Sequence, residues 1–532
     1  MKQNIITILL CLTALTNALP QTQNNEPGST KGFHNPILPG FYPDPSVCRV
    51  GEDYYMVTST FAYFPGIPIF HSKDLVNWEQ IGHCLTRDSQ LDLAEASMTH
   101  GLWAPTIHHH DGVFYMVNTN MPDKGHFLVT TTNPAGEWSD PITIKQGGID
   151  PSLFWDEDGK SYFISTGGIN LGMAITPIDL KTGKLLAEPV TVWMGTGDRW
   201  PEGPHIYKKD GLYYLMIAEG GGTNDGHCIT MARSTNLLGP YEPCPNNPIL
   251  THHRRISQNN PIQAPGHGDL IHAHDGSWWL VCLGIRPSGK HVLGRETFLA
   301  PVHWPKNGWP LINGGNPLSL DMDDCPTLPK HPFPPKPVRD DFNTSTPDLT
   351  WNYIRNPRRE NYSLTDSKGF LTLTGASATL DERVNPTFLG RRQQHREFTA
   401  TTLLEFAPAS TNEIAGITMY MNENFHYDFY VRKENTLVLR YRLSKIDHIE
   451  KEIKLKSHKV QLRITGEDGA YRFSYSEDGG KTFNTAGTTD MCFISNDNAG
   501  GFTGVYIGLY ATGNGKQSRT KARYDWFDYE GK

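Results

Sequence analysis

The sequence predicts an all-β protein in which a five-bladed β-propeller is followed by a β-sandwich. Three observations lead to this fold class. One unit, made of a short apolar strand, a glycine turn and an aromatic-rich strand, recurs five times in the first two thirds of the chain. A proline-rich stretch then ends this pattern, and short alternating strands of another kind fill the last third. Long segments with helical periodicity are hard to find, and glycine and proline are plentiful.

Each copy of the repeated unit has a turn glycine between two strands. These glycines are about 47 to 65 residues apart, which is irregular but in each case long enough for one four-stranded antiparallel sheet. Repeated sheets of this size are typical of a β-propeller, and five copies predict five blades. The turn glycines are Gly51, Gly112, Gly159, Gly211 and Gly276.

The residues that open each unit are expected to meet in space. In a propeller the first strand of each blade lies nearest the central axis, so equivalent positions converge on one end of the channel. A single Asp-Pro-Ser opening is often only turn chemistry. A purely structural repeat would tend to place the same turn residue in every blade, whereas here the openings differ. They are Asp44, Trp103-Ala104, Asp150, Glu202 and His267.

Three of these openings are carboxylates, and their pattern points to glycoside hydrolysis. That reaction needs one protonated carboxyl to assist the leaving oxygen and one ionised carboxylate to activate water. Glu202 is the candidate acid, because Trp200 and Pro201 beside it favour a neutral carboxyl. Asp44 is the candidate base, and Asp150 is the candidate for tuning the pKa of the acid and orienting it.

Aromatic and basic residues near the openings are candidates for binding a sugar. Arg295 is the candidate for contacting sugar hydroxyls, with Arg286 as the alternative. His267 could bind substrate or water, or contact a structural cation, for which calcium would suit better than zinc. The run His108–His110 is expected in a solvated loop rather than at a metal. About half of the aromatic candidates are expected to be core instead of sugar platforms; they are Phe41, Phe61, Tyr63, Phe64, Trp103, Phe154 and Trp200.

Composition and the N-terminus limit the class of protein. The net charge of −8 argues against a nucleic-acid-binding surface and suits a neutral ligand. Residues 1–20 have the charge, apolar core and small residues of a signal peptide, which predicts a secreted or periplasmic protein. No other segment is long and apolar enough for a membrane helix. The remaining seven cysteines show no pattern of a disulfide framework or zinc cluster.

The predicted domains are a propeller over residues 33–323, a stiff proline-rich linker over 324–338 and a sandwich over 339–532. Two hypotheses exist for the sandwich. It is either an independent carbohydrate-binding module or a packed accessory domain that inserts a loop at the rim of the active site. Phe502 is the candidate for the tip of that loop, with the sandwich core as its alternative location.

Several segments resemble glycoside hydrolase family 43, over about residues 33 to 320. The resemblance implies a five-bladed propeller and hydrolysis with inversion, with Asp44 as base, Asp150 as pKa modulator and Glu202 as acid. The two-domain β-xylosidases of the family are also similar at Phe61, Trp103, His267 and Arg295, and they favour a packed, concanavalin-like sandwich. The segments that carry the resemblance are Asn35–Leu38, Phe41–Ser46, Thr58–Phe61, Phe64–Gly66, His71–Trp78, Gly101–Pro105, Gly148–Phe154, Glu202–His205, Gly266–Asp269 and Leu293–Thr297.

We therefore expect an exo-acting β-xylosidase on xylan-derived or arabinoxylan-derived oligosaccharides, with no required cofactor and with calcium left open at His267. The alternatives are an α-L-arabinofuranosidase and a non-catalytic sugar-binding propeller. Inversion predicts that the carboxyls of Asp44 and Glu202 lie about 6.5–9.5 Å apart. The sequence does not decide between xylose and arabinose, and it leaves self-assembly open.

Overall fold

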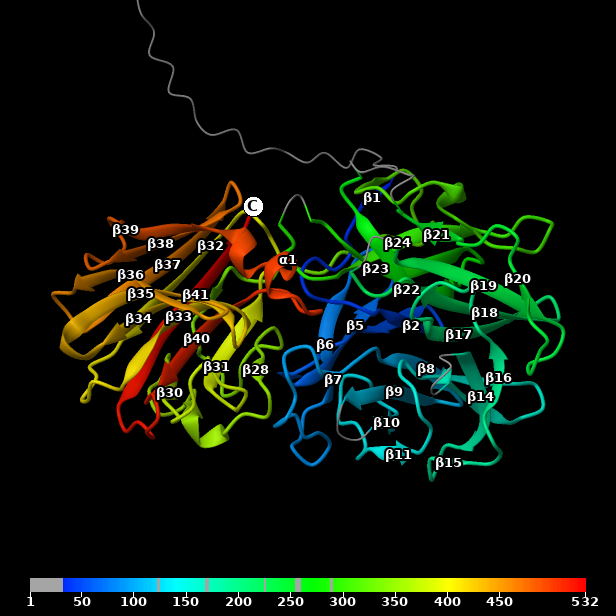
Figure 1. The fold of residues 1–532 in the computed structure, drawn as a ribbon, viewed down its shortest axis with the longest axis horizontal. Helices are drawn as coiled ribbons and strands as arrows, with labels where there is room; N and C mark the ends of the chain where they lie inside the picture. The colour runs from blue at the N-terminus through cyan, green and yellow to red at the C-terminus, as the bar shows by residue number, and fades with distance from the viewer. Residues whose placement is uncertain (1–31, 122–124, 168–171, 224–225, 254–259, 288–289) are drawn as a thin grey trace, which may run out of the picture.

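The computed structural model describes residues 32–121, 125–167, 172–223, 226–253, 260–287 and 290–532. The predicted signal peptide lies outside these ranges. Two β domains lie side by side, the first coloured blue to green and the second yellow to red in Figure 1. Within the described ranges, no helix has both the length and the apolar composition needed to cross a bilayer.

The first domain is a five-bladed β-propeller, as predicted, and each blade is an antiparallel sheet. Blade 1 has β2 (Ser46–Val50), β3 (Asp53–Val57), β5 (Gly66–Ser72) and β6 (Glu79–Leu85). Blade 2 has β7 (Gly101–Leu102), β8 (Thr106–His110), β9 (Val113–Met121), β10 (Gly125–Thr131) and β11 (Ile142–Ile144). Blade 3 has β12 (Ser152–Trp155), β13 (Ser161–Gly167), β14 (Gly172–Asp179), β15 (Lys184–Leu185) and β16 (Val190–Trp193). Blade 4 has β17 (Glu202–Lys209), β18 (Leu212–Glu219), β19 (Cys228–Ser234), β20 (Glu242–Pro243) and β21 (Leu250–Thr251). Blade 5 has β22 (Gln263–His272), β23 (Trp278–Ile285), β24 (Glu296–His303) and β25 (Leu311–Ile312).

The turn glycines join the first two long strands of each blade. In blade 4, Asp210 and Gly211 have φ values of 52° and 78°, so both central residues of the two-residue loop have positive φ, as in a type I′ hairpin. One expectation about this region is wrong: His108–His110 form the end of strand β8, not a solvated loop. The ring of His110 stacks on Trp155 at 4.8 Å, because the outward face of β8 packs against blade 3.

The second domain is a β-sandwich of two antiparallel sheets. Its core is formed by apolar residues from both sheets, with Phe398 and Leu462 on one sheet and Ile417 and Leu509 on the other. One sheet runs in the order β29-β30-β41-β32-β37-β38-β39, with β27 beside β41, and the other in the order β31-β40-β33-β34-β35-β36. Their bounds are β27 (Arg339–Asp340), β29 (Tyr362–Ser363), β30 (Leu371–Thr374), β31 (Thr387–Arg392), β32 (Phe398–Glu405), β33 (Ile414–Asn422), β34 (Phe425–Arg432), β35 (Thr436–Leu443), β36 (Ile446–Lys454), β37 (Lys459–Glu467), β38 (Ala470–Ser476), β39 (Asn484–Asp490), β40 (Tyr506–Thr512) and β41 (Lys521–Gly531). Among the described residues, the second domain also has the short helices η3 (Arg359–Asn361), η4 (Lys433–Asn435), η5 (Met491–Ile494) and α1 (Asn496–Ala499), and η2 (Asn313–Gly315) follows β25 in the first domain.

The two domains share a continuous apolar core. Strand β4 (Tyr63–Phe64) of the propeller pairs with β28 (Tyr353–Ile354) of the second domain. The ring of Tyr63 stacks on that of Tyr506 with centroids 3.7 Å apart, and Arg392 donates to the backbone oxygen of Phe41 at 2.7 Å. The sandwich is therefore a packed accessory domain, and the hypothesis of an independent module does not fit this interface.

The chain closes against itself beside blade 5, where β1 (Phe33–His34) pairs with β26 (Asp321–Met322). Between β26 and β27 the proline-rich segment contains neither helix nor strand. Leu328 of this segment is buried with Phe70 and Trp279 of the propeller, so the segment is packed against the first domain.

Candidate active site

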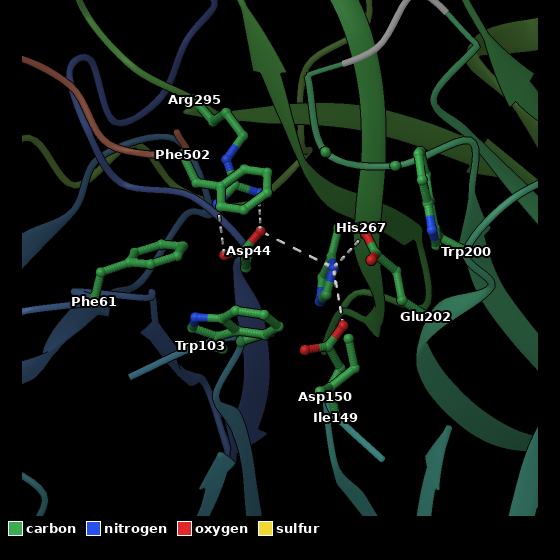
Figure 2. Close-up of a pocket in the computed structure, with 13 residues that line it drawn as sticks. Asp44, Phe61, Trp103, Ile149, Asp150, Trp200, Glu202, His267, Arg295 and Phe502 are labelled. Atoms are coloured by element: carbon green, nitrogen blue, oxygen red, sulfur yellow. Dashed lines mark hydrogen bonds and ion pairs between the residues drawn. The ribbon is translucent and has the colours of Figure 1, made fainter. Parts of the chain in front are cut away.

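A pocket of about 350 Å³ lies where the first strands of the five blades converge. It is within the common size range of small-molecule sites. Figure 2 shows carboxylates at its base and aromatic rings around them. The lining residues are Asp44, Phe61, Trp103, Ala104, Ile149, Asp150, Trp200, Glu202, Gly221, Gly222, His267, Arg295 and Phe502. All eight predicted site residues are therefore brought together here.

The polar residues of the pocket come from four blades. Asp44 and Asp150 lie just before β2 and β12, Glu202 is the first residue of β17, and His267 lies within β22. Asp44, Asp150 and His267 have φ values of 54°, 52° and 42°, in the left-handed region that non-glycine residues seldom adopt. Such conformations cost on the order of 1–3 kcal/mol and concentrate at functional sites, where they aim a side chain.

Asp44 is held by donors on both of its carboxyl oxygens. Arg295 donates through Nη1 to Oδ1 at 2.7 Å and through Nη2 to Oδ2 at 3.2 Å, and the Ser59 hydroxyl donates to Oδ2 at 2.6 Å. The Asp44 side chain is buried, with 4% exposed. Three donated hydrogen bonds suit a carboxyl group that acts only as an acceptor. The two-point contact with Arg295 fixes the plane of the Asp44 carboxyl group.

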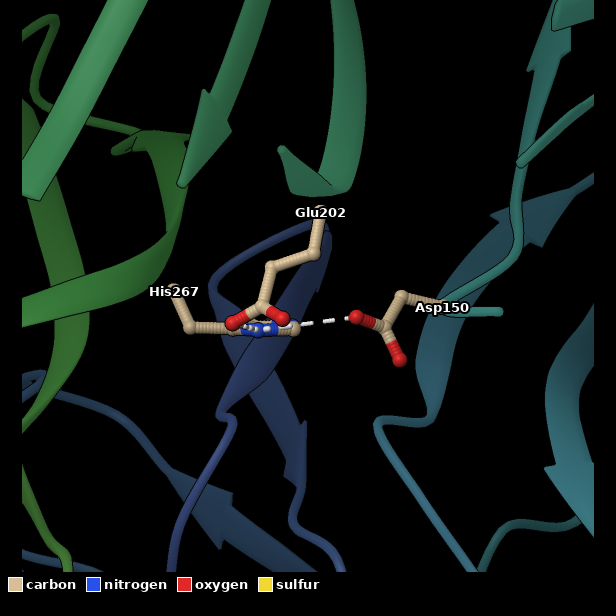
Figure 3. A group of neighbouring side chains, drawn as sticks. All are labelled: Asp150, Glu202 and His267. Carbon is tan, nitrogen blue, oxygen red and sulfur yellow. Dashed lines mark ion pairs between the residues drawn. The ribbon is translucent and has the colours of Figure 1, made fainter. Parts of the chain in front are cut away.

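Glu202, Asp150 and His267 form a cluster (Figure 3), and Asp44 lies beside it (Figure 2). The Nδ1 atom of His267 lies 3.8 Å from Glu202 Oε1 and 4.0 Å from both Asp150 Oδ2 and Asp44 Oδ1. Because Asp44 and Glu202 each have an oxygen within 4.0 Å of one nitrogen, these oxygens are less than about 8 Å apart. An upper limit of about 8 Å is compatible with the separation of about 6.5–9.5 Å expected for inversion. That the two carboxyls are at least about 6.5 Å apart stays a prediction.

The pKa values of the three groups in this cluster differ strongly from their ordinary values. Burial raises the pKa of Asp150 to about 8, with Glu202 and Asp44 adding to the effect and His267 opposing it. Burial also acts to raise the pKa of Glu202, but interactions with the imidazoles of His227 and His267 outweigh burial and lower it to about 2. Burial acts to lower the pKa of His267, yet Glu202, Asp44 and Asp150 raise it to about 9. One carboxyl of the Asp150–Glu202 pair therefore stays neutral at pH 7, because burial and like charges oppose ionising both.

The same cluster is the candidate cation site of the described residues. Ligand atoms of Asp150, Glu202 and His267 lie within 4.8 Å of one another. Calcium takes about six to eight oxygen ligands. Two carboxyls and an imidazole whose pKa is raised to about 9 do not fit a directly ligated calcium ion. An indirect calcium contact at His267 stays a prediction.

Three of the seven aromatic candidates line the pocket. They are Phe61, Trp103 and Trp200, and Trp200 is 49% exposed. The other four candidates are buried in the hydrophobic core and do not line the pocket. Phe41, Tyr63 and Phe64 belong to the core shared by the two domains, and Phe154 is buried with residues of blades 3 and 4.

Arg286 also lies outside the pocket lining. Its guanidinium donates to both carboxyl oxygens of buried Glu296, at 2.7 and 2.8 Å. Glu296 in turn accepts from the backbone nitrogen of Gly40 at 2.8 Å. Arg286 thus has a structural ion pair, and Arg295 is the arginine that reaches the carboxylates.

Phe502 comes from the sandwich domain and forms one wall of the pocket. Its ring lies 6.1 Å from that of Phe61 and 6.5 Å from that of Trp103, and the Arg295 guanidinium lies 5.4 Å from it. With 36% of the residue exposed, Phe502 is not part of the sandwich core.

The segment that carries Phe502 is anchored to blade 5. The backbone nitrogens of Asn496 and Val505 donate to the carbonyls of His291 and Val292, each at 2.9 Å. Lys290 also reaches Asp490 at 2.5 Å. These bonds on both sides of the segment fix the rim relative to the propeller.

Sequence reasoning missed several residues of this site. Ser59 and His227 touch or face the carboxylates, and Ile149, Gly221 and Gly222 line the pocket. Ser59 lies within the Thr58–Phe61 segment, but a serine after a strand has no distinctive signal. His227 lies two strands away from Glu202 in blade 4, and only the folded sheet brings them together.

Comparison with known proteins identifies the family. The model of "Glycosyl hydrolases family 43" matches residues 33–310, more than half of the chain. The chain belongs to this family. Residues 339–530 match the "Beta xylosidase C-terminal Concanavalin A-like domain". The family 43 chain is thus a glycoside hydrolase with the two-domain organisation that the resemblance implied.

Several relatives align over nearly the whole length of the chain. A non-reducing end alpha-L-arabinofuranosidase of Bacteroides ovatus is 42% identical, covering 99% of both chains. A xylosidase/arabinosidase of Butyrivibrio fibrisolvens is 40% identical, covering 93% of this chain and 99% of the relative. The solved structure "Bacteroides ovatus Xyloglucan PUL GH43B" superposes with a TM-score of 0.90 at 41% identity, covering 94% of this chain and all of that one.

Proposed function

We propose that this family 43 hydrolase is an inverting exo-β-xylosidase that removes the terminal xylose from xylo-oligosaccharides. The single observation that carries the proposal is the pocket in which Asp44 and Glu202 lie on either side of His267. A water between two carboxyls at this spacing can attack one face of the sugar while the acid acts on the other. Asp44 is the proposed base, Glu202 the acid and Asp150 the modulator of the acid.

The hydrogen-bond donors around Asp44 orient it for its role as the base. Arg295 and Ser59 occupy both carboxyl oxygens of Asp44 and hold its plane. As water attacks the anomeric carbon, Asp44 takes one of its protons. A fixed carboxylate needs little rearrangement to do this, which is how orientation lowers a barrier.

The acid must carry its proton when the glycosidic oxygen arrives. Asp150 and Glu202 together retain one proton at neutral pH, as their pKa values show. Substrate binding displaces water and places the leaving oxygen beside Glu202, where transfer of the proton cleaves the C–O bond. Asp150 passes the shared proton to Glu202, and the ionised Asp150 that remains is a like charge that keeps Glu202 in its acid form.

The shape of the pocket supports exo action. Phe61, Trp103 and Phe502 stand together on one side, and Trp200 stands apart from them (Figure 2). We infer that the wall contributed by Phe502 of the second domain limits the pocket to a terminal sugar and blocks the passage of an uninterrupted polysaccharide. Aromatic faces suit a xylopyranose ring, which lacks an exocyclic group.

The second candidate activity is that of an α-L-arabinofuranosidase, which the name of the Bacteroides ovatus relative favours. The match to a β-xylosidase C-terminal domain favours xylose. Kinetics on aryl β-xyloside and aryl α-L-arabinofuranoside decide between them. We expect the larger kcat/KM on the xyloside, and a larger value on the arabinoside would overturn the choice of xylose.

Proton NMR of the first product tests the stereochemistry. We expect α-xylose to appear before mutarotation, because inversion converts a β-linkage to the α-anomer. Release of β-xylose would refute the roles of Asp44 and Glu202. The Glu202→Gln variant separates an enzyme from a sugar-binding propeller, since a binding protein would keep its affinity and have no turnover to lose.

We also propose that the protein is exported, on the basis of the N-terminal 20 residues. N-terminal sequencing of the protein recovered outside the cytoplasm, expected to begin near residue 20, tests this proposal. Recovery of the full-length chain from the cytoplasm alone would contradict it.

A further inference from the structure

His227 is a buried histidine whose second ring nitrogen has no partner. The ring is fully buried, and Nε2 makes no hydrogen bond within the described structure. This atom lies 3.7 Å from Oε1 of Glu202. Unpaired polar atoms are rare in protein interiors, and each one calls for a structural or functional explanation.

The other ring nitrogen determines which tautomer His227 adopts. Nδ1 lies 3.0 Å from the backbone oxygen of Ala264, and a carbonyl oxygen only accepts, so Nδ1 carries a hydrogen. Ala264 stands in an irregular part of β22, where the register with β23 shifts between Gln263 and Gly266. The irregularity turns this carbonyl toward blade 4. A neutral ring with its hydrogen on Nδ1 presents a lone pair at Nε2.

The surroundings fix the ring in this place. A Cβ at Gly266 would lie 2.2 Å from Cε1 of His227, so only glycine leaves room for the ring. His227 directly precedes β19, whose partner β18 also pairs with β17, the strand that begins at Glu202. The imidazole and the carboxyl are thus held by one sheet, and Nε2 remains aimed at Glu202.

We propose that His227 is a positioning residue that accepts a hydrogen bond from the protonated carboxyl of Glu202. This inference rests on the proposed role of Glu202 as the acid. A lone pair facing the carboxyl favours the acid and disfavours the carboxylate, since the ionised form would meet a second acceptor. When Glu202 gives its proton to the leaving oxygen, the bond to Nε2 breaks. It forms again when the carboxyl is reprotonated.

The charge state of His227 decides the direction of its effect. An imidazolium ring would donate to Glu202 and stabilise the carboxylate, and an interaction of that kind acts to lower the pKa of Glu202. The neutral Nδ1–H tautomer acts in the opposite direction. His267 from blade 5 and Asp150 from blade 3 also face the Glu202 carboxyl, and both stay unchanged in the variants below.

Two substitutions separate the two ring nitrogens. His227→Asn keeps a donor at the position of Nδ1 but has no atom at that of Nε2, whereas His227→Gln places an amide oxygen near the position of Nε2. We expect His227→Asn to lower kcat at least about tenfold on an alkyl xyloside, whose leaving group needs a proton, and to change kcat on dinitrophenyl xyloside less than about twofold. The alkaline limb of its pH profile should move to lower pH, and His227→Gln should restore part of both properties.

An equal loss of kcat on both substrates in His227→Asn would overturn the proposal. An alkaline limb of its pH profile that does not move would also overturn it. Glu202→Ala in the same assays is the control for the acid role. If Glu202→Ala also lowers kcat by the same factor on both substrates, the assignment of Glu202 as the acid fails. If Glu202→Ala discriminates between the leaving groups and His227→Asn does not, only the role of His227 fails.

A measurement on the unaltered protein covers the case in which the variants do not fold. Neutron diffraction from deuterium-exchanged crystals locates the hydrogens on both rings. Deuterium on His227 Nδ1, none on Nε2 and one on the Glu202 carboxyl is the expected result. Deuterium on Nε2 would overturn the proposal.

Discussion

A buried histidine in the sandwich domain should make stability depend on pH. His426 is fully buried, and its ring nitrogens lie 2.9 Å from Asp428 and 3.0 Å from Asp381. Arg440 and, through it, Asp447 complete the group of charges facing this site. Burial acts to lower the pKa of His426, but the carboxylates of Asp428 and Asp381 outweigh burial and raise it from 6.5 to about 9.

The magnitude follows from linkage. A pKa raised from 6.5 to about 9 corresponds to roughly 3 kcal/mol of stability contributed by the protonated ring. Because the folded pKa is the higher one, this contribution is complete below about pH 6.5 and is lost as the pH rises through about 9. For a domain of this size, roughly 3 kcal/mol corresponds to about 6–12 °C in Tm.

Thermal melts of the wild type and His426→Asn at pH 6 and pH 10 measure the effect. We expect the difference in Tm between the two proteins to be about 6–12 °C larger at pH 6 than at pH 10. His448→Asn is the matched control, since the His448 side chain is 54% exposed on the same sheet. A difference in Tm that is the same at both pH values would refute the reasoning.

Two further predictions concern the pocket. Phe502→Ala removes an aromatic wall contact of roughly 1 kcal/mol or more, so kcat/KM on xylobiose should fall at least about fivefold with little change in Tm. Phe493→Ala is the control, because Phe493 is 46% exposed on the same segment and lies outside the pocket lining. Unchanged kinetics of Phe502→Ala on both short and long substrates would count against the rim role. Arg295→Lys leaves a point charge that cannot bind both oxygens of Asp44, so kcat should fall by at least about tenfold. Full activity in Arg295→Lys, measured on aryl xyloside, would show that the two-point contact has no part in preparing the base.

The sequence by itself determined the repeating architecture of this protein. Each blade is formed by neighbouring strands joined by short turns, so its signals are local: apolar strands, an Asp-Gly or Gly turn, and a second aromatic strand. Equivalent positions in a propeller converge on one axis, so the repeat alone also predicted that Asp44, Asp150, Glu202 and His267 would meet. The pocket places all four together.

Only the tertiary structure decided which side chains face the pocket and which face the core. Phe61 and Phe64 are three residues apart, equally apolar and part of one buried cluster, yet only Phe61 also lines the pocket, while Phe64 lies in β4, which pairs with β28 of the second domain. The contact between His227 and Glu202 likewise depends on sheet pairing and on the bulge in β22. Such contacts join residues distant in sequence, and no local pattern encodes which partner a side chain meets across a sheet or a domain interface.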